Sequence, residues 1–110
     1  MKTALAQKQC ANCDGGTPRL EGHALENLHK QLGNGWLVID GHHLEKQFKF
    51  PDFVEALEFT NSIGAIAEKQ GHHPDIFLTY GEVRVKIFTH QQDGLTESDF
   101  ILAAKIEEAS

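Results

Sequence analysis

Residues 51–75 read PDFVEALEFTNSIGAIAEKQGHHPD, and this stretch sets the order of the elements on either side of it. Pro51 suits the first position of a helix, where its missing N–H costs nothing, and Asp52 complements the helix dipole in the first turn. Gly71 is suited to end the helix, and Pro74 prevents its continuation. The stretch therefore predicts one long helix and a turn into a strand. One face of that helix carries, at helical spacing, Phe53, Ala56, Leu57, Thr60, Ile63, Gly64 and Ala67.

Upstream of this stretch the sequence predicts one helix and a hairpin. Leucines recur at helical spacing over about 20–32, and Gly33 follows as a C-cap. Two short apolar strands, 36–39 and 43–50, flank the turn residues Asp40 and Gly41.

Downstream, two more strands and a final helix complete the pattern. The strands are expected over 75–80 and 81–90, with valines alternating along the second. The last helix is expected to start at Thr96, because residues 96–99 read as a capping box flanked by apolar residues. The fold class is therefore α+β, with a four-stranded antiparallel sheet and three helices on one face in the order αββαββα. We expect a single domain over 19–110, preceded by a flexible lead-in over 1–18.

Composition narrows the class of protein. The chain has 110 residues, of which 40% are hydrophobic and 24% charged, as in ordinary globular domains. Its formal net charge of -6 argues against binding nucleic acid directly. No apolar run approaches the roughly 20 residues needed to cross a bilayer, so no membrane association is expected. No signal peptide is evident either, which favours a cytoplasmic location.

Seven histidines are the unusual feature, and four of them form the doublets His42-His43 and His72-His73. Histidine exchanges protons near neutral pH, which indicates acid–base or metal chemistry. The second doublet lies between the long helix and the third strand, and its two side chains should point in different directions. The alternative is a solvated helix end whose histidines interact with the helix dipole. His90 ends the fourth strand, on the face opposite the valines, where a surface role is common.

Two other motifs invite functional readings. His42-His43 lacks the following proline and is interpreted as a solvated turn. Cys10 and Cys13 have the spacing of half a zinc site, but a structural zinc needs four ligands, so an unstructured pair of reduced thiols is favoured over zinc.

The spaced residues Glu68, His72, His73, Pro74, Tyr80, His90 and Asp99 together resemble the signature of the pterin-4a-carbinolamine dehydratase family. Residues 44–53 and 94–99 are also similar to that family, and the resemblance extends over about 20–109. The cysteine-bearing lead-in and the acidic balance look like those of bacterial members.

The resemblance implies that His72, His73 and His90 form the catalytic and pterin-binding set, with Pro74 and Tyr80 also in the substrate site. Which histidine is the acid and which the base stays open. No metal and no cofactor are expected, because the dehydration that the resemblance implies requires only proton transfer and the loss of water.

Two carboxylates are expected to support this set. Glu68 lies one helical turn before His72, so we expect it to orient that ring. Asp99 is interpreted as structural, as the third residue of the capping box.

The implied activity is removal of water from a 4a-hydroxytetrahydropterin to give the quinonoid dihydropterin, in tetrahydrobiopterin recycling. A homodimer or homotetramer and an aromatic amino acid hydroxylase are the implied partners. Two alternatives remain: a binding module that acts as a dimerisation cofactor for another protein, and a small metal-binding protein that uses the histidines.

Overall fold

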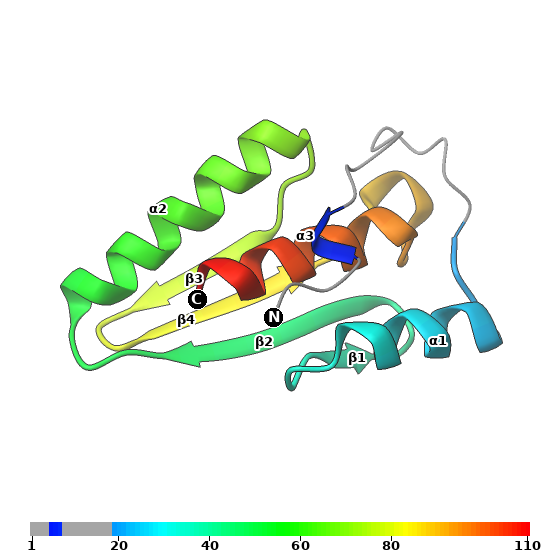
Figure 1. Ribbon diagram of the computed structural model, residues 1–110, viewed down its shortest axis with the longest axis horizontal. Coiled ribbons are helices and arrows are strands. Elements are labelled where there is room, and N and C mark those ends of the chain that lie inside the picture. The colour runs from blue at the N-terminus through cyan, green and yellow to red at the C-terminus, as the bar shows by residue number, and fades with distance from the viewer. Residues whose placement is uncertain (1–4, 8–18) are drawn as a thin grey trace.

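The computed structural model describes residues 5–7 and 19–110, and Figure 1 shows the arrangement. The order of helices and strands confirms the predicted pattern. The three-residue 3-10 helices η1 and η2 are additional to it. In chain order the elements are η1 (Leu5–Gln7), α1 (Gly22–Leu32), β1 (Leu37–Ile39), β2 (His43–Lys49), α2 (Phe53–Gln70), β3 (Asp75–Thr79), β4 (Glu82–Ile87), η2 (His90–Gln92) and α3 (Glu97–Ala109).

The four strands form one antiparallel sheet in the order β1-β2-β4-β3. Because side chains alternate along a strand, the register places Leu44 beside Ile87 and Phe48 beside Val83 on the same buried face. The alternate residues, such as Arg84, face away from the core. The apolar face packs against the helices, which confirms the α+β class (Figure 1).

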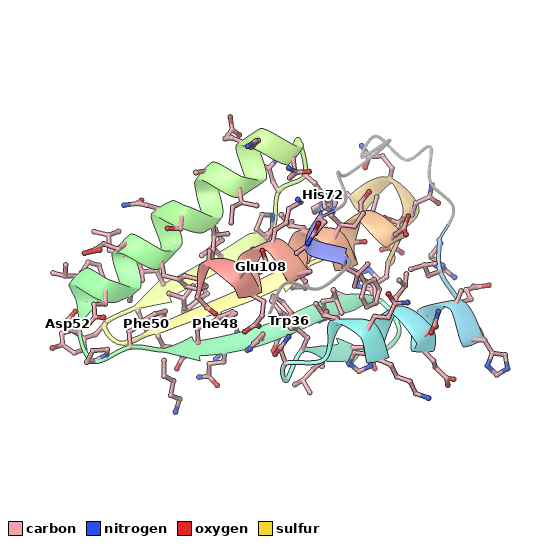
Figure 2. The ribbon with its side chains drawn as sticks, viewed as in Figure 1. Trp36, Phe48, Phe50, Asp52, His72 and Glu108 are labelled. Carbon is pink, nitrogen blue, oxygen red and sulfur yellow. The ribbon has the colours of Figure 1, made fainter. Side chains whose placement is uncertain are left out.

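Aromatic rings join β2 to α2 within the core. The Phe59 ring of α2 lies 4.7 Å from that of Phe48 and 5.2 Å from that of Phe50, between ring centroids. Trp36 packs edge-on against Phe48, and its indole N–H donates to Glu107 Oε1 of α3 at 2.9 Å. Figure 2 shows Phe50, Phe48 and Trp36 in one row below α3. These contacts fix both long helices on the sheet.

The start of α2 differs from the prediction by two positions, since the first helical residue is Phe53 and not Pro51. Asp52 is the N-cap: it has an extended backbone and its carboxylate accepts a hydrogen bond from the Glu55 N–H at 2.9 Å. Pro51 therefore precedes the cap. The predicted end is confirmed, since Gly71 closes the helix in the left-handed conformation at φ 67°.

β4 ends at Ile87, three residues before the predicted end at His90. The chain instead curls into η2 and returns through Asp93, whose φ of 49° is left-handed. A bridge between Thr89 and Gly94 closes this loop. We call residues 88–94 the η2 loop.

Part of the N-terminal segment packs on the domain. Within the stretch expected to be a flexible lead-in, Leu5 and Ala6 are buried, and Lys105 of α3 donates to the Ala6 carbonyl at 2.8 Å. Cys10 and Cys13 lie outside the described residues. Across residues 5–7 and 19–110, no helix has the length and apolar character needed to cross a membrane.

Two glycines give opposite predictions for stability. A Cβ on Gly81 would lie 2.9 Å from the Phe50 carbonyl oxygen. The two backbones are held this close because the Phe50 N–H donates to the Gly81 carbonyl. Gly81→Ala should therefore lower the free energy of unfolding by about 1–3 kcal/mol. At Gly64 of α2 a Cβ meets no atom within 4 Å, so Gly64→Ala should raise it by up to about 1 kcal/mol. Urea unfolding of both variants measures this, and equal stability of Gly81→Ala and wild type would contradict the tight approach.

Candidate active site

The end of α2 turns His72 into the protein. The His72 N–H donates to the Ala67 carbonyl at 3.2 Å, which wraps the chain around Gly71 and away from the helix axis. The His72 side chain, labelled in Figure 2, is consequently buried. Its Nε2 lies 2.6 Å from Asp99 Oδ1. A carboxylate bound to one ring nitrogen fixes the orientation of the imidazole and leaves Nδ1 as its other proton-exchanging atom.

Asp99 is fully buried and joins three segments of the chain. Its Oδ1 binds His72, while Oδ2 accepts from the Thr96 N–H at 2.7 Å and from the Thr89 hydroxyl at 2.9 Å. The capping box predicted at residues 96–99 is therefore present. The structural interpretation of Asp99 was incomplete, however, because the same carboxylate also orients a histidine of the predicted site. Sequence reasoning missed this contact because 27 positions separate the two residues.

His73 points the other way, as expected for adjacent residues in an extended segment. It is exposed, and its Nε2 lies 2.5 Å from Glu68 Oε2. The predicted pairing of Glu68 with His72 is wrong. Gly71 breaks the helical spacing, so that His72 leaves the face on which Glu68 lies and His73 takes its place.

His90 begins η2 and is exposed, with its ring against that of Phe88 at a centroid distance of 4.3 Å. The preceding Thr89 is buried on Asp99, and Asp99 also holds His72. The structure thus brings the three predicted catalytic histidines to one end of the β3–β4 hairpin.

Pro74 and Tyr80 have different positions. Pro74 is half-buried and leads directly from His73 into β3. Tyr80 occupies the turn at the opposite end of that hairpin, where it is 70% exposed. At about 3.3 Å per strand residue, the six steps from Pro74 to Tyr80 span about 20 Å. Within one chain the structure does not bring Tyr80 to the histidines.

The other doublet is not the solvated turn that the sequence suggested. His42 Nε2 lies 2.8 Å from Asp93 Oδ1, and His42 Nδ1 lies 3.1 Å from His43 Nδ1. The His43 side chain is only 14% exposed, and burial, followed by the charges of Lys86 and His42, lowers its pKa. No local pattern could have shown this, since Asp93 is 51 positions from His42.

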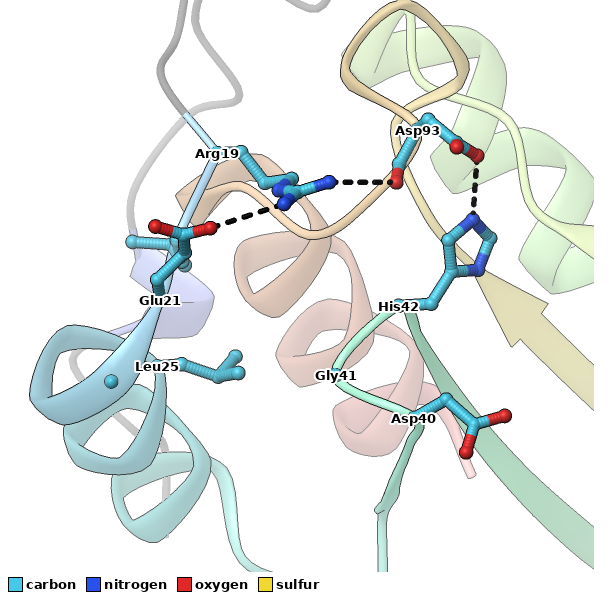
Figure 3. A pocket seen from close by; sticks show the side chains of 9 residues that line it. Arg19, Glu21, Leu25, Asp40, Gly41, His42 and Asp93 are labelled. Atoms are coloured by element: carbon cyan, nitrogen blue, oxygen red, sulfur yellow. Dashed lines mark hydrogen bonds and ion pairs between the residues drawn. The ribbon is translucent and has the colours of Figure 1, made fainter.

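A pocket of about 400 Å³ lies beside the His42-His43 doublet (Figure 3). Arg19 crosses its rim, donating to the Asp93 carbonyl at 3.5 Å and pairing with Glu21 at 3.0 Å. His42 and Asp93 both line the pocket, so one end of the η2 loop forms part of its lining.

The arrangement is suited to proton transfer. His72 has a buried carboxylate partner and His73 an exposed one. The third histidine, His90, directly follows Thr89, which donates a hydrogen bond to the buried carboxylate. Imidazole nitrogens can act as proton donors and acceptors, so the arrangement offers candidate acid and base groups. Among the described residues, no cluster of three or more histidine, cysteine, aspartate or glutamate side chains is arranged to hold a metal ion.

Relatives of known name match this chain over nearly their whole length. Proteins from Alkaliphilus metalliredigens and Rubrobacter xylanophilus, both named as inferred pterin-4-alpha-carbinolamine dehydratases, are each 52% identical over 103 residues. The matches cover 94% of this chain and 93% and 95% of the two relatives.

Two solved structures are also similar. One, described as a transcriptional coactivator/pterin dehydratase from Brucella melitensis, has a TM-score of 0.77 at 35% identity and covers 83% of this chain and 97% of its own. A pterin dehydratase-like RuBisCO assembly factor of the alpha-carboxysome has a TM-score of 0.59 at 21% identity, covering 71% and 92%, and shows the fold alone.

The family model described as pterin 4 alpha carbinolamine dehydratase matches residues 18–109, which include all three histidines and both carboxylates of the site. The chain belongs to the pterin-4a-carbinolamine dehydratase family.

Proposed function

We propose that this protein removes water from a 4a-hydroxytetrahydropterin by histidine acid–base catalysis and releases the quinonoid dihydropterin. The observation that carries the proposal is the buried His72–Asp99 pair, with His73–Glu68 and His90 at the same end of the hairpin. Family membership supports the reaction class.

The chemistry requires only proton exchange. The lone pair on pterin N5 expels the 4a-hydroxyl, and an acid must protonate that hydroxyl as it leaves as water. A base then removes a proton from the cationic pterin to give the neutral quinonoid product. Histidine is suited to both steps. Asp99 orients the ring of His72, and Glu68 orients the ring of His73.

This reaction regenerates pterin after ring hydroxylation. Aromatic amino acid hydroxylases produce the 4a-hydroxy compound, so we propose that such a hydroxylase supplies the substrate and that both act in the cytoplasm.

We also propose that the chain forms a homodimer or homotetramer. Among the strands that the structure describes, β3 lies at an edge of the sheet, and strand edges are commonly paired. Large apolar side chains are exposed on α2 and β3, at 62% for Val54, 39% for Leu57 and 61% for Phe77. Covering them would remove apolar surface from water.

A binding role is the second candidate function. The description of the Brucella melitensis structure joins the words coactivator and pterin dehydratase, and the exposed apolar face of α2 would suit docking of another helix. This alternative replaces the first if the purified chain fails to dehydrate the pterin.

The first prediction here concerns the histidines. His72→Ala, His73→Ala and His90→Ala should each lower kcat/KM for dehydration by roughly 10²–10⁴-fold, because each removes a proton-transfer or pterin-binding group. His23→Ala, which removes a fully exposed ring, is the matched control and should stay within a few-fold of wild type. Circular dichroism must show that each variant is folded. Wild-type activity in all three folded variants would overturn the site.

The second prediction separates the two roles of Asp99. In Asp99→Asn, the amide oxygen can keep the helix cap only by turning its NH₂ toward His72, which forces the N–H of that ring onto Nδ1. We expect kcat/KM to fall by roughly 10- to 10³-fold, as when a catalytic histidine is held in the wrong tautomer.

Thr96→Ala is the control for that experiment. It removes the cap hydroxyl and should lower the free energy of unfolding by about 1 kcal/mol while leaving kcat/KM within a few-fold of wild type. If Asp99→Asn behaves like Thr96→Ala, Asp99 has only the structural role.

The third prediction concerns assembly. Light scattering after size exclusion should give two or four times the chain mass of 12.2 kDa at micromolar concentration. Leu57→Glu should reduce the mass if α2 forms an interface, whereas Asn61→Glu, on an exposed polar position of α2, should not. A monomer mass for wild type would count against assembly.

A further inference from the structure

The η2 loop carries His90 but has no regular structure beyond a three-residue 3-10 turn. Its internal hydrogen bonds are local: Gln92 N–H donates to the Thr89 carbonyl and Asp93 N–H to that of His90, both at 3.1 Å, and Thr89 and Gly94 exchange backbone hydrogen bonds where the loop closes. Such a turn is fixed in space only by what holds it from outside. On its inner side, Thr89 donates to the buried Asp99 at 2.9 Å.

On its outer side, the loop is held by His42. The His42 ring comes from the turn between β1 and β2 and binds the Asp93 carboxylate at 2.8 Å (Figure 3). Asp93 sits where the chain reverses at a left-handed φ of 49°, so a contact at this residue restrains the direction of the whole return.

The same ring also contacts the loop through Phe88. The Phe88 ring lies between two histidines, with centroid distances of 4.6 Å to His42 and 4.3 Å to His90. Aromatic rings at these separations attract each other, and the two pairs pack with interplanar angles of 41° and 42°. The position of the His90 ring therefore depends on the His42 ring through one intervening side chain.

His42 is itself held in a defined orientation. Its Nδ1 lies 3.1 Å from Nδ1 of His43, which is anchored in β2 opposite Ile39. Burial lowers the pKa of His43, which favours the neutral ring with a single N–H. An N–H on His43 Nδ1 donated to His42 Nδ1 leaves Nε2 of His42 as the donor to Asp93.

We propose that His42 is a positioning residue of the dehydratase site, which holds the η2 loop through Asp93 and aligns the His90 ring through Phe88. The inference rests on the proposed function, in which His90 contacts the pterin. His42 does not touch the substrate. It acts from a hairpin that the catalytic signature of the chain does not include.

The experiment compares four variants with the wild type: His42→Ala, His42→Gln, Asp93→Ala and the double variant His42→Ala/Asp93→Ala. Amide hydrogen exchange at Gln92 and Asp93 reads the loop directly, and steady-state dehydration reads its effect on the reaction. His42→Ala should accelerate exchange at these two amides and lower kcat/KM by roughly 10-fold or more, since small misplacements of a site group are costly. His42→Gln should restore both, because its amide N–H can reach Asp93.

The double variant tests whether the two residues act through one bond. If they do, it loses no more activity than the worse single variant, because the second change has no contact left to remove. His23→Ala is the matched control and should alter neither the exchange nor the rate.

The results distinguish this inference from the proposed function. Unchanged exchange in His42→Ala overturns the positioning role whether or not the enzyme is active. Faster exchange with kcat/KM within two-fold of wild type, while His90→Ala is impaired, also overturns it. An inactive wild type overturns the proposed function itself. An active His90→Ala leaves that function standing but removes the role of His90, and the positioning role of His42 is overturned with it.

Discussion

The carboxylate of Asp99 lies fully buried where the end of α2, the segment after β4 and the start of α3 meet. A buried carboxylate is destabilising unless hydrogen-bond donors surround it. Here the donors come from His72, Thr89 and Thr96, one from each segment. The need to satisfy this one group therefore couples the capping of α3 to the placement of both histidine-bearing segments.

The antiparallel sheet explains why those segments are neighbours. β3 and β4 form a hairpin, so the residue that enters β3 and the residue that leaves β4 lie at the same end, with Asp75 paired to Lys86. His73 and His90 flank that pair along the chain. The hairpin turn lies at the other end, which is why Tyr80 is separated from the histidines although it belongs to the same sequence signature.

The two histidine doublets have related designs but different places in the molecule. In each, one ring binds an aspartate far away in sequence: His72 binds Asp99, and His42 binds Asp93. Both aspartates lie just beyond β4, on either side of the capping residue Thr96. The η2 loop is thus held on the core side by Asp99, through Thr89, and on the side of the β1–β2 turn by His42, through Asp93. His90 lies between Thr89 and Asp93 in this loop.

The sequence alone determined the order of elements, the α+β class, the glycine end of α2 and the capping box of α3. These features are encoded by side-chain periodicity and by backbone preferences that act within a few residues. It also singled out three histidines as the candidate catalytic set, through a spaced signature. The contacts of Asp99 with His72, of His73 with Glu68 and of His42 with Asp93 were decided only by the tertiary structure. Two of these join residues more than 25 positions apart, and the third depends on how Gly71 turns the chain. Local preferences fix where a helix ends, but the partner of a side chain beyond that end is fixed by how the sheet and helices pack.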